Sequence, residues 1–340
     1  MLSYQPMKAI LAEMSFEQRE KIQRKIPSLQ TTNTVVPYTY DYVFIGPHGL
    51  WKLNDWQWDH GRREWRDLLR DDSDDSDEDG NRRPRYEYSQ EENDRLPLRY
   101  IRDETRIRHL QLTGLPESIV QQDPESFKIH VSELTMGAKE SYFMKEDNGE
   151  IFRSLEPFLK HPLEKLTFRS TPETLPLLSH PLIKDCKELS LGKHSNHFLI
   201  TVEELLLHNK MDQTHLEVAF HYWPSHLGER NSGVTFVRDL VQHWITIDKA
   251  IGSTFTSPTE EYFLICDMFD ELKTVFNARK SRMEELGSDF FAHCFIISLN
   301  ETSEIVARAI KDKREYMGHK CDYALKMEVR PIGSTEAAKN

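Results

Sequence analysis

A rhythm of strand-like and helix-like segments between residues 100 and 220 constrains the fold of this chain more than any other feature. Triplets with apolar first and last positions recur at residues 110–112, 134–136, 166–168, 189–191 and 218–220. Segments with helical character, such as 150–160 and 201–209, lie between these triplets. Strands and helices that alternate at about 20 to 30 residues are typical of leucine-rich repeats.

We therefore predict an α/β fold in which residues 100–332 form a degenerate, leucine-rich-repeat-like solenoid of strands and helices. The asparagine ladder of a regular repeat is missing, and a βα array of another α/β topology is the alternative. Alternate side chains of such strands face away from the core. We expect Arg169, Ser190 and His221 to face outward, on a surface that suits a protein ligand.

Three later segments complete this region. The apolar positions of residues 233–247 follow helical spacing, which predicts one longer helix. Residues 290–299 form a continuous apolar run and predict a buried strand. Polar and apolar residues alternate over 323–332, which predicts the last strand. Residues 333–340 form a tail.

Residues 1–30 predict two short helices. The first has an apolar stripe with helical spacing, formed by Met7, Ile10, Leu11 and Met14, and Pro6 is tolerated in its first turn. The second begins at Ser15, because a serine followed three residues later by Gln18 forms a capping box. Its apolar positions are Ile22 and Ile26, its other faces carry Arg19, Lys21, Arg24 and Lys25, and Pro27 ends it.

Helices of about ten residues are marginal alone, so another surface must cover their apolar stripes. The rest of this chain provides that surface if the helices are ordinary core elements. A partner protein provides part of it if the stripe is a docking site. The spacing of the apolar residues leaves both interpretations open.

Residues 31–70 predict a strand and a tryptophan-rich connecting segment. Residues 34–45 are rich in β-branched and aromatic residues, which favours the strand. Tryptophans stand at positions 51, 56, 58 and 65 among several arginines. They can stack on nucleic-acid bases, but packing or protein contact is the interpretation we favour, since an acidic run follows.

Residues 71–99 contain this acidic run and predict a disordered loop, because like charges this close repel. Ser76 precedes three acidic residues, a context that acidophilic kinases phosphorylate, and Ser73 would become a secondary target. A simple solubilising spacer is the alternative interpretation of the segment.

Composition and motifs exclude several classes of function. The formal charge of −12 disfavours binding to nucleic acid, and no apolar run reaches the ~20 residues that cross a membrane. Phosphate-binding glycine loops, zinc-binding helix motifs and nucleophile motifs are missing, so we predict no enzyme, cofactor or metal. His215, His221 and His226 lie close in sequence, but no second ligand pair completes a metal site. The four cysteines form no C-x-x-C pair and are typical of a reduced cytoplasmic or nuclear protein.

The first 45 residues resemble the start of the nematode-expanded F-box C family. The residues that carry the resemblance are Leu2, Ser3, Tyr4, Lys8, Leu11, Met14, Lys25, Ile26, Pro27, Ser28, Leu29, Val35, Val36 and Pro37. An F-box is a helical module that docks on a Skp1-type linker of a cullin ubiquitin ligase. Its usual second helix runs toward a Val-x-x-x-Trp, whereas here Pro27 ends the helix and no tryptophan follows Ile26.

The resemblance implies a substrate-recognition adaptor of a Skp1-cullin ubiquitin ligase. The residues implied to contact the Skp1-related linker are Pro6, Met7, Ile10, Leu11, Met14, Ile22 and Ile26. The repeat domain would then hold an unknown protein target. A non-enzymatic interaction scaffold without ligase docking is the alternative function.

Overall fold

The computed structural model describes residues 4–33, 35–46, 49–59, 64–67, 97–137, 148–171, 174–193, 200–208, 210, 213–219, 232–259, 262–282, 293–312, 315–316 and 319–334. The chain divides into two compact units. Unit 1 comprises Met1–Gly137 and Met144–Leu163, and unit 2 comprises Ala138–Phe143 and Glu164–Asn340. Among the helices within these ranges, none is both long and apolar enough to cross a bilayer.

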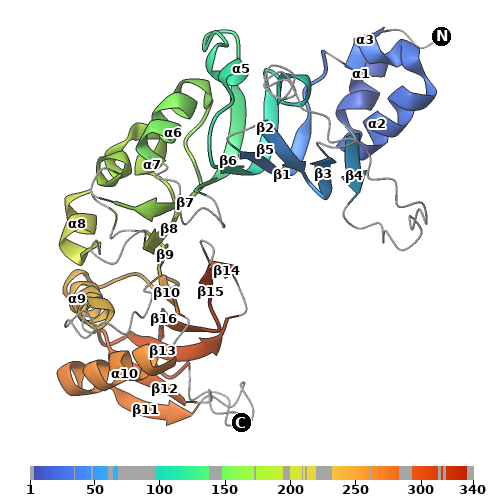
Figure 1. The fold of residues 1–340 in the computed structure, drawn as a ribbon. Coiled ribbons are helices and arrows are strands. Elements are labelled where there is room, and N and C mark those ends of the chain that lie inside the picture. Colours follow the sequence, from blue (N-terminus) through green and yellow to red (C-terminus); the bar gives the residue numbers. More distant parts are fainter. Residues whose placement is uncertain are drawn as a thin grey trace, which may run out of the picture. The chain divides into compact units, whose positions relative to one another are not determined.

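Unit 1 begins with the two predicted helices, α1 (Tyr4–Ala12) and α2 (Phe16–Lys25), which Figure 1 shows in blue. The predicted capping box at the start of α2 is confirmed. The backbone N–H of Gln18 donates to the Ser15 hydroxyl, and the Ser15 N–H donates to the Gln18 side chain. Helix α2 ends before Pro27, and the short elements η1 (Pro27–Leu29) and α3 (Gln30–Asn33) follow.

The strands of unit 1 run in the order β4-β3-β2-β1-β5-β6. Their bounds are β1 (Thr39–Gly46), β2 (Gly49–Leu53), β3 (Trp56–Asp59), β4 (Glu64–Asp67), β5 (Thr105–Leu112) and β6 (Ile129–Met136). Strands β1, β5 and β6 are parallel, and β1 to β4 form an antiparallel meander. The tryptophan-rich segment therefore contributes strands. Unit 1 also contains the short helices α5 (Glu117–Val120), α6 (Asn148–Leu155) and η3 (Glu156–Phe158).

Unit 2 opens with four parallel strands in chain order, β7 (Lys165–Ser170), β8 (Glu188–Lys193), β9 (His215–Val218) and β10 (Thr254–Thr259). The helical connections are η4 (Leu175–Ser179), α7 (Pro181–Lys184), α8 (Val202–Leu207) and α9 (Ser232–Ile247). Figure 1 shows α7, α8 and α9 on one side of these strands. That side is the core, where Leu189 and Leu216 of the strands and Trp244 of α9 are buried.

The rest of unit 2 is antiparallel. Strand β10 is followed in the sheet by β16, β13, β12 and β11. The bounds of these elements are α10 (Tyr262–Phe276), β11 (Arg279–Arg282), β12 (His293–Ser298), β13 (Ser303–Lys311), β14 (Glu315–Tyr316), β15 (His319–Lys320) and β16 (Tyr323–Pro331). The helix predicted at 233–247 and the strands predicted at 290–299 and 323–332 are confirmed as α9, β12 and β16.

The protein is a mixed α/β protein with short N-terminal helices, and the predicted solenoid was not found. The strand triplets at 110–112, 134–136, 166–168 and 189–191 do lie in β5, β6, β7 and β8. After β10, however, β12 and β13 are joined by the short turn 299–302. A connection this short joins antiparallel strands only, because a parallel pair needs a crossover of about a dozen residues. The repeat therefore ends at β10.

Candidate functional site

Helix α2 is anchored to unit 1 by the ring of Phe16, which is buried in an aromatic cluster. The ring centre lies 5.8 Å from those of Tyr38 and Tyr40, and 5.6 Å from that of Tyr100. Trp56 of the meander approaches the same ring at 6.2 Å, so at least one tryptophan of this segment packs within the chain. Edge-to-face contacts of this kind contribute beyond the area that they bury.

Arg19, which lies outside the predicted apolar stripe of the second helix, is nevertheless buried. Its guanidinium donates to the carbonyl oxygens of Val36 at 3.2 Å and Pro37 at 2.9 Å, and lies 4.6 Å from the centre of the Tyr38 ring. Burial lowers the pKa of the guanidinium. Helical spacing could not indicate this burial, because it does not show that carbonyl groups before β1 need a donor.

A second arginine holds the other end of this connection. The guanidinium of Arg102 lies 4.8 Å from the centre of the Tyr38 ring and donates to the carbonyl oxygens of Asn33 and Val36. The guanidinium groups of Arg19 and Arg102 therefore both contact the Tyr38 ring, and together they fix the segment between α3 and β1. The N-terminal helices are thus attached to the first strand of unit 1 by named polar and aromatic contacts.

The seven predicted linker-contact residues fall into three groups by exposure. Ile10 and Ile26 are about half exposed, at 50% and 47%, and Pro6 is exposed as well. Met7, Met14 and Ile22 are partly buried. Leu11 is only 3% exposed, so its side chain packs within this chain and does not reach the surface. We call Ile10 and Ile26 the N-terminal patch. The predicted phosphorylation sites Ser73 and Ser76 lie outside the described residues.

A second surface lies on unit 2, on the side of β7 to β10 that faces away from the buried leucines. Cross-strand pairing places polar residues there in two rows. One row is Lys165, Glu188, His215 and Thr254, and the other is Thr167, Ser190, Glu217 and Thr256. We call these eight residues the polar strand face. It is the surface on which we expected a ligand, although it is built on four strands only.

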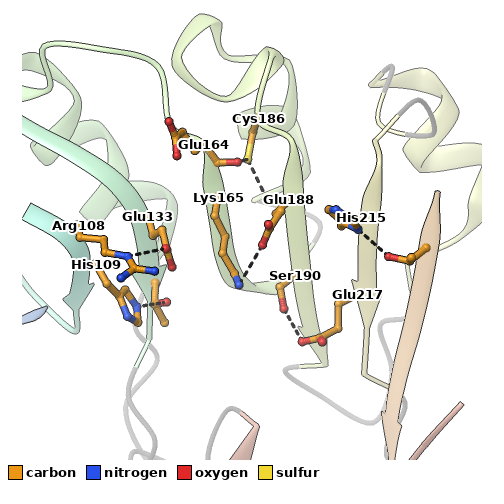
Figure 2. A network of polar contacts seen from close by, with 12 residues as sticks. Arg108, His109, Glu133, Glu164, Lys165, Cys186, Glu188, Ser190, His215 and Glu217 are labelled. Atoms are coloured by element: carbon orange, nitrogen blue, oxygen red, sulfur yellow. Dashed lines mark hydrogen bonds and ion pairs between the residues drawn. The ribbon is translucent and has the colours of Figure 1, made fainter. Parts of the chain in front are cut away.

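Three contacts connect the members of these rows, as Figure 2 shows. Lys165 Nζ lies 3.1 Å from Glu188 Oε2, and the Ser190 hydroxyl donates to Glu217 Oε1 at 2.9 Å. His215 Nδ1 lies 2.7 Å from the hydroxyl of Thr254. Each side chain is thus held along its own row. Ser190 lies on the expected outward side of the sheet, but its side chain is only 5% exposed.

Between the rows lies a cavity of about 80 Å³, which we call the strand-face hollow. Its lining consists of Lys165, Glu188, Leu189, Ser190, His215, Leu216, Glu217, Thr254 and Thr256. The two leucines point to the core, so only their backbone faces the hollow. The walls are the flanking polar side chains. The volume of the hollow is several times the ~15 Å³ that one water molecule needs.

Cys186 stabilises the start of β8 behind this face. Its thiol donates to the carbonyl oxygens of Glu164 at 3.2 Å and Glu188 at 2.9 Å, as drawn in Figure 2. Burial raises the pKa of the thiol to about 11, so it is a weak nucleophile at neutral pH. A structural role follows from both facts.

His215, His221 and His226 are the three histidines whose closeness in sequence raises the question of a metal site. The latter two lie outside the described residues, as does the side chain of Arg169. In the part of the chain that the structure describes, no three histidine, cysteine or acidic side chains gather as a metal site would require. His215 instead contacts Thr254, as given above.

Unit 1 carries a separate ionic cluster at the start of β5. Glu104 accepts from His130 Nε2 at 2.9 Å and from Lys160 Nζ at 2.6 and 2.8 Å. The hydrogen bond from His130 and those from Lys160 lower the pKa of Glu104 to about 2. The backbone of Glu104 has a left-handed φ of 63°, which turns the chain into β5 and is uncommon for this residue type.

Sequence reasoning did not single out Lys165, Glu188 or Glu217. Each of them stands directly before the first apolar residue of a predicted triplet, at positions 166, 189 and 218. The shared offset is a signal that these residues lie on one face. Only the register of the strands shows that they form two rows across the sheet.

The fold and these two surfaces define a mixed α/β protein with an anchored helical N-terminus and a polar strand face. Residues 98–261 match the family described as Domain of unknown function (DUF3557). The matched range includes every residue that lines the strand-face hollow, whereas α1 and α2 lie outside it. No curated protein and no solved structure matches the chain.

Proposed function

We propose that the chain is a substrate-recognition adaptor of a Skp1-cullin ubiquitin ligase. Its N-terminal helices dock on a Skp1-type linker protein, and its polar strand face holds a protein target. The proposal combines the F-box-like residues of the first 45 positions with the surfaces of the two units. Ligase assembly needs no catalytic group in this chain, because the adaptor only brings two proteins together.

The observation that carries the proposal is the exposure of the N-terminal patch. Helix α2 is fixed from one side by Phe16 and Arg19, while Ile10 and Ile26 leave about half of their surface in water. Apolar side chains that remain exposed on a fixed helical platform are suited to a partner, since burying a full isoleucine contributes ~1.5–3 kcal/mol.

The target side of the proposal is the polar strand face. Its rows offer carboxylate, hydroxyl, imidazole and ammonium groups at fixed positions on paired strands. Groups held on strands are positioned more firmly than groups on loops, which favours specific recognition of a protein surface.

A scaffold without ligase docking is the second candidate, and the length of α2 favours it. Helix α2 has ten residues and ends at Lys25. An F-box second helix runs further toward a tryptophan that is missing here, so the area available to a linker is smaller. The two candidates differ in one property only, which is binding to the linker.

Capture of the full chain on an immobilised Skp1-related protein tests the proposal. The test variant is Ile10→Lys combined with Ile26→Lys, which places cations near the C-terminal ends of α1 and α2, where the helix dipole favours them. We expect the natural chain to be retained and the double variant to be lost. Retention of neither protein would leave only the scaffold function, and equal retention of both would show that the N-terminal patch is not the docking surface.

The control variant is Ile251→Lys, which changes an isoleucine of unit 2 that is 54% exposed. It adds the same charge to a comparable surface position, and we expect it to be retained fully. Substitution of Leu11 is unsuitable as a docking test, because this residue is buried and its loss would weaken the fold itself.

A further inference from the structure

The strand-face hollow has the shape of a slot between two rows of side chains. Glu188 pairs with His215 along one wall, and Ser190 pairs with Glu217 along the other. The intervening pair, Leu189 and Leu216, points to the core, so neither of these two side chains fills the space between the walls. A flat group can therefore lie over the strand backbones between the rows.

The walls of the slot are held before any ligand arrives. Ser190 is 5% exposed and donates to Glu217 Oε1 at 2.9 Å, which keeps this carboxylate along its row. Lys165 Nζ, 3.1 Å from Glu188 Oε2, holds the second carboxylate at the edge of the slot. Polar groups that are already oriented lose less conformational entropy on binding.

The charges of the lining favour a cation. Glu188 and Glu217 contribute two negative charges and Lys165 one positive charge, so the lining carries −1 with a neutral His215. The whole chain carries −12, which attracts basic partners and repels acidic ones. Carboxylate and hydroxyl oxygens around the slot are hydrogen-bond acceptors for a donor group.

We propose that the strand-face hollow binds an arginine side chain of the protein target. The guanidinium is planar, carries five N–H donors and remains charged, which suits a slot lined by acceptors. Charge-assisted hydrogen bonds to the carboxylates of Glu188 and Glu217 would be the strongest contacts. The identity of this ligand as part of a protein rests on the proposed function.

The probe for the experiment is N-acetyl-arginine N-methylamide, titrated into the isotope-labelled full chain and followed by backbone NMR shifts. We expect shift changes centred on Ser190 and Glu217, with a dissociation constant in the millimolar range for so small a ligand. The matched probe is the citrulline analogue, which keeps the shape and removes the charge. It should bind at least about tenfold more weakly, since the charged hydrogen bonds are lost.

Two variants test the assignment in opposite directions. Glu217→Gln keeps the size of the side chain and an acceptor for Ser190, and should weaken arginine binding about tenfold. Lys165→Met removes a competing cation and should strengthen it. The control is Glu203→Gln on α8, an exposed carboxylate away from the slot, which should leave the affinity unchanged.

Equal affinity for the arginine and citrulline probes would overturn the inference, as would unchanged arginine affinity in both Glu217→Gln and Lys165→Met. Absence of shifts in the hollow would overturn it too. Capture by the Skp1-related protein is scored separately through Ile10 and Ile26. Capture without arginine binding rejects the inference and keeps the adaptor function, whereas arginine binding without capture supports the inference and rejects ligase docking.

Discussion

The guanidinium of Arg19 lies 4.6 Å from the centre of the Tyr38 ring, and this contact ties the second helix to the first strand of unit 1. The same guanidinium donates to two backbone carbonyl oxygens just before that strand. One side chain thus fixes a helix, a connection and an aromatic cluster. This contact occupies the inner surface of the second helix, whereas Ile10 and Ile26 remain about half exposed.

Replacement of Arg19 should therefore destabilise unit 1. Arg19→Met keeps much of the aliphatic packing but removes hydrogen bonds to the carbonyl groups of Val36 and Pro37. We expect the free energy of unfolding to fall by ~2–4 kcal/mol, because the carbonyl groups of Val36 and Pro37 each lose a charged donor. Urea denaturation followed by tryptophan fluorescence measures this, since four of the six tryptophans stand at positions 51–65.

The control for this change is Lys21→Met on the same helix. Lys21 is exposed, so its substitution should change the free energy of unfolding by ~0.5 kcal/mol or less. Equal effects of the two substitutions would show that Arg19 does not anchor the helix.

Leu11 and Ile10 are neighbours in sequence with opposite expected roles. Leu11→Ala should lower the free energy of unfolding by ~2–4 kcal/mol, because it leaves a cavity under α1. Ile10→Ala should cost about 0.5 kcal/mol, since half of this side chain is already in water. Urea denaturation of both variants checks the difference, and a large loss for Ile10→Ala would mean that its exposed surface is needed for the fold.

Glu104 should make unit 1 sensitive to acid. Its pKa of about 2 in the folded state lies below the usual 4.5, because His130 and Lys160 hydrogen-bond to the charged form. The stability that these bonds contribute is present above pH 4.5 and is lost as the pH falls from 4.5 toward 2. In the Glu104→Gln variant, the urea concentration at the unfolding midpoint should therefore fall less steeply between pH 4.5 and 2 than in the natural chain.

The matched control for this pH series is Glu125→Gln, an exposed carboxylate of the same unit. It should reproduce the pH dependence of the natural chain. If Glu104→Gln also reproduces it, the ionic cluster at the start of β5 does not contribute to folding.

Local signals in the sequence predicted much of the secondary structure. Ser15 and Gln18 form the expected capping box, and the apolar triplets at 110–112, 134–136, 166–168 and 189–191 lie in strands. These signals are reliable because each depends on residues a few positions apart. Their success does not extend to the topology of the sheet.

The features that the sequence did not predict depend on distant partners. Burial of Arg19 is set by carbonyl groups 17 and 18 residues away. The antiparallel half of unit 2 depends on β10 pairing with β16, which lies some 70 residues later in the chain. The strand-face hollow requires the register of β8 against β9, and spacing within one strand cannot supply that register.

The most direct measurement is the dissociation constant of the purified full chain for a Skp1-related protein, by isothermal titration calorimetry. We predict saturable one-to-one binding. We also predict an affinity at least ~30-fold lower for the variant with Ile10→Lys and Ile26→Lys, because two half-exposed isoleucines would be buried in the complex. A folded natural chain that shows no binding, or a double variant that binds as tightly, would contradict these predictions.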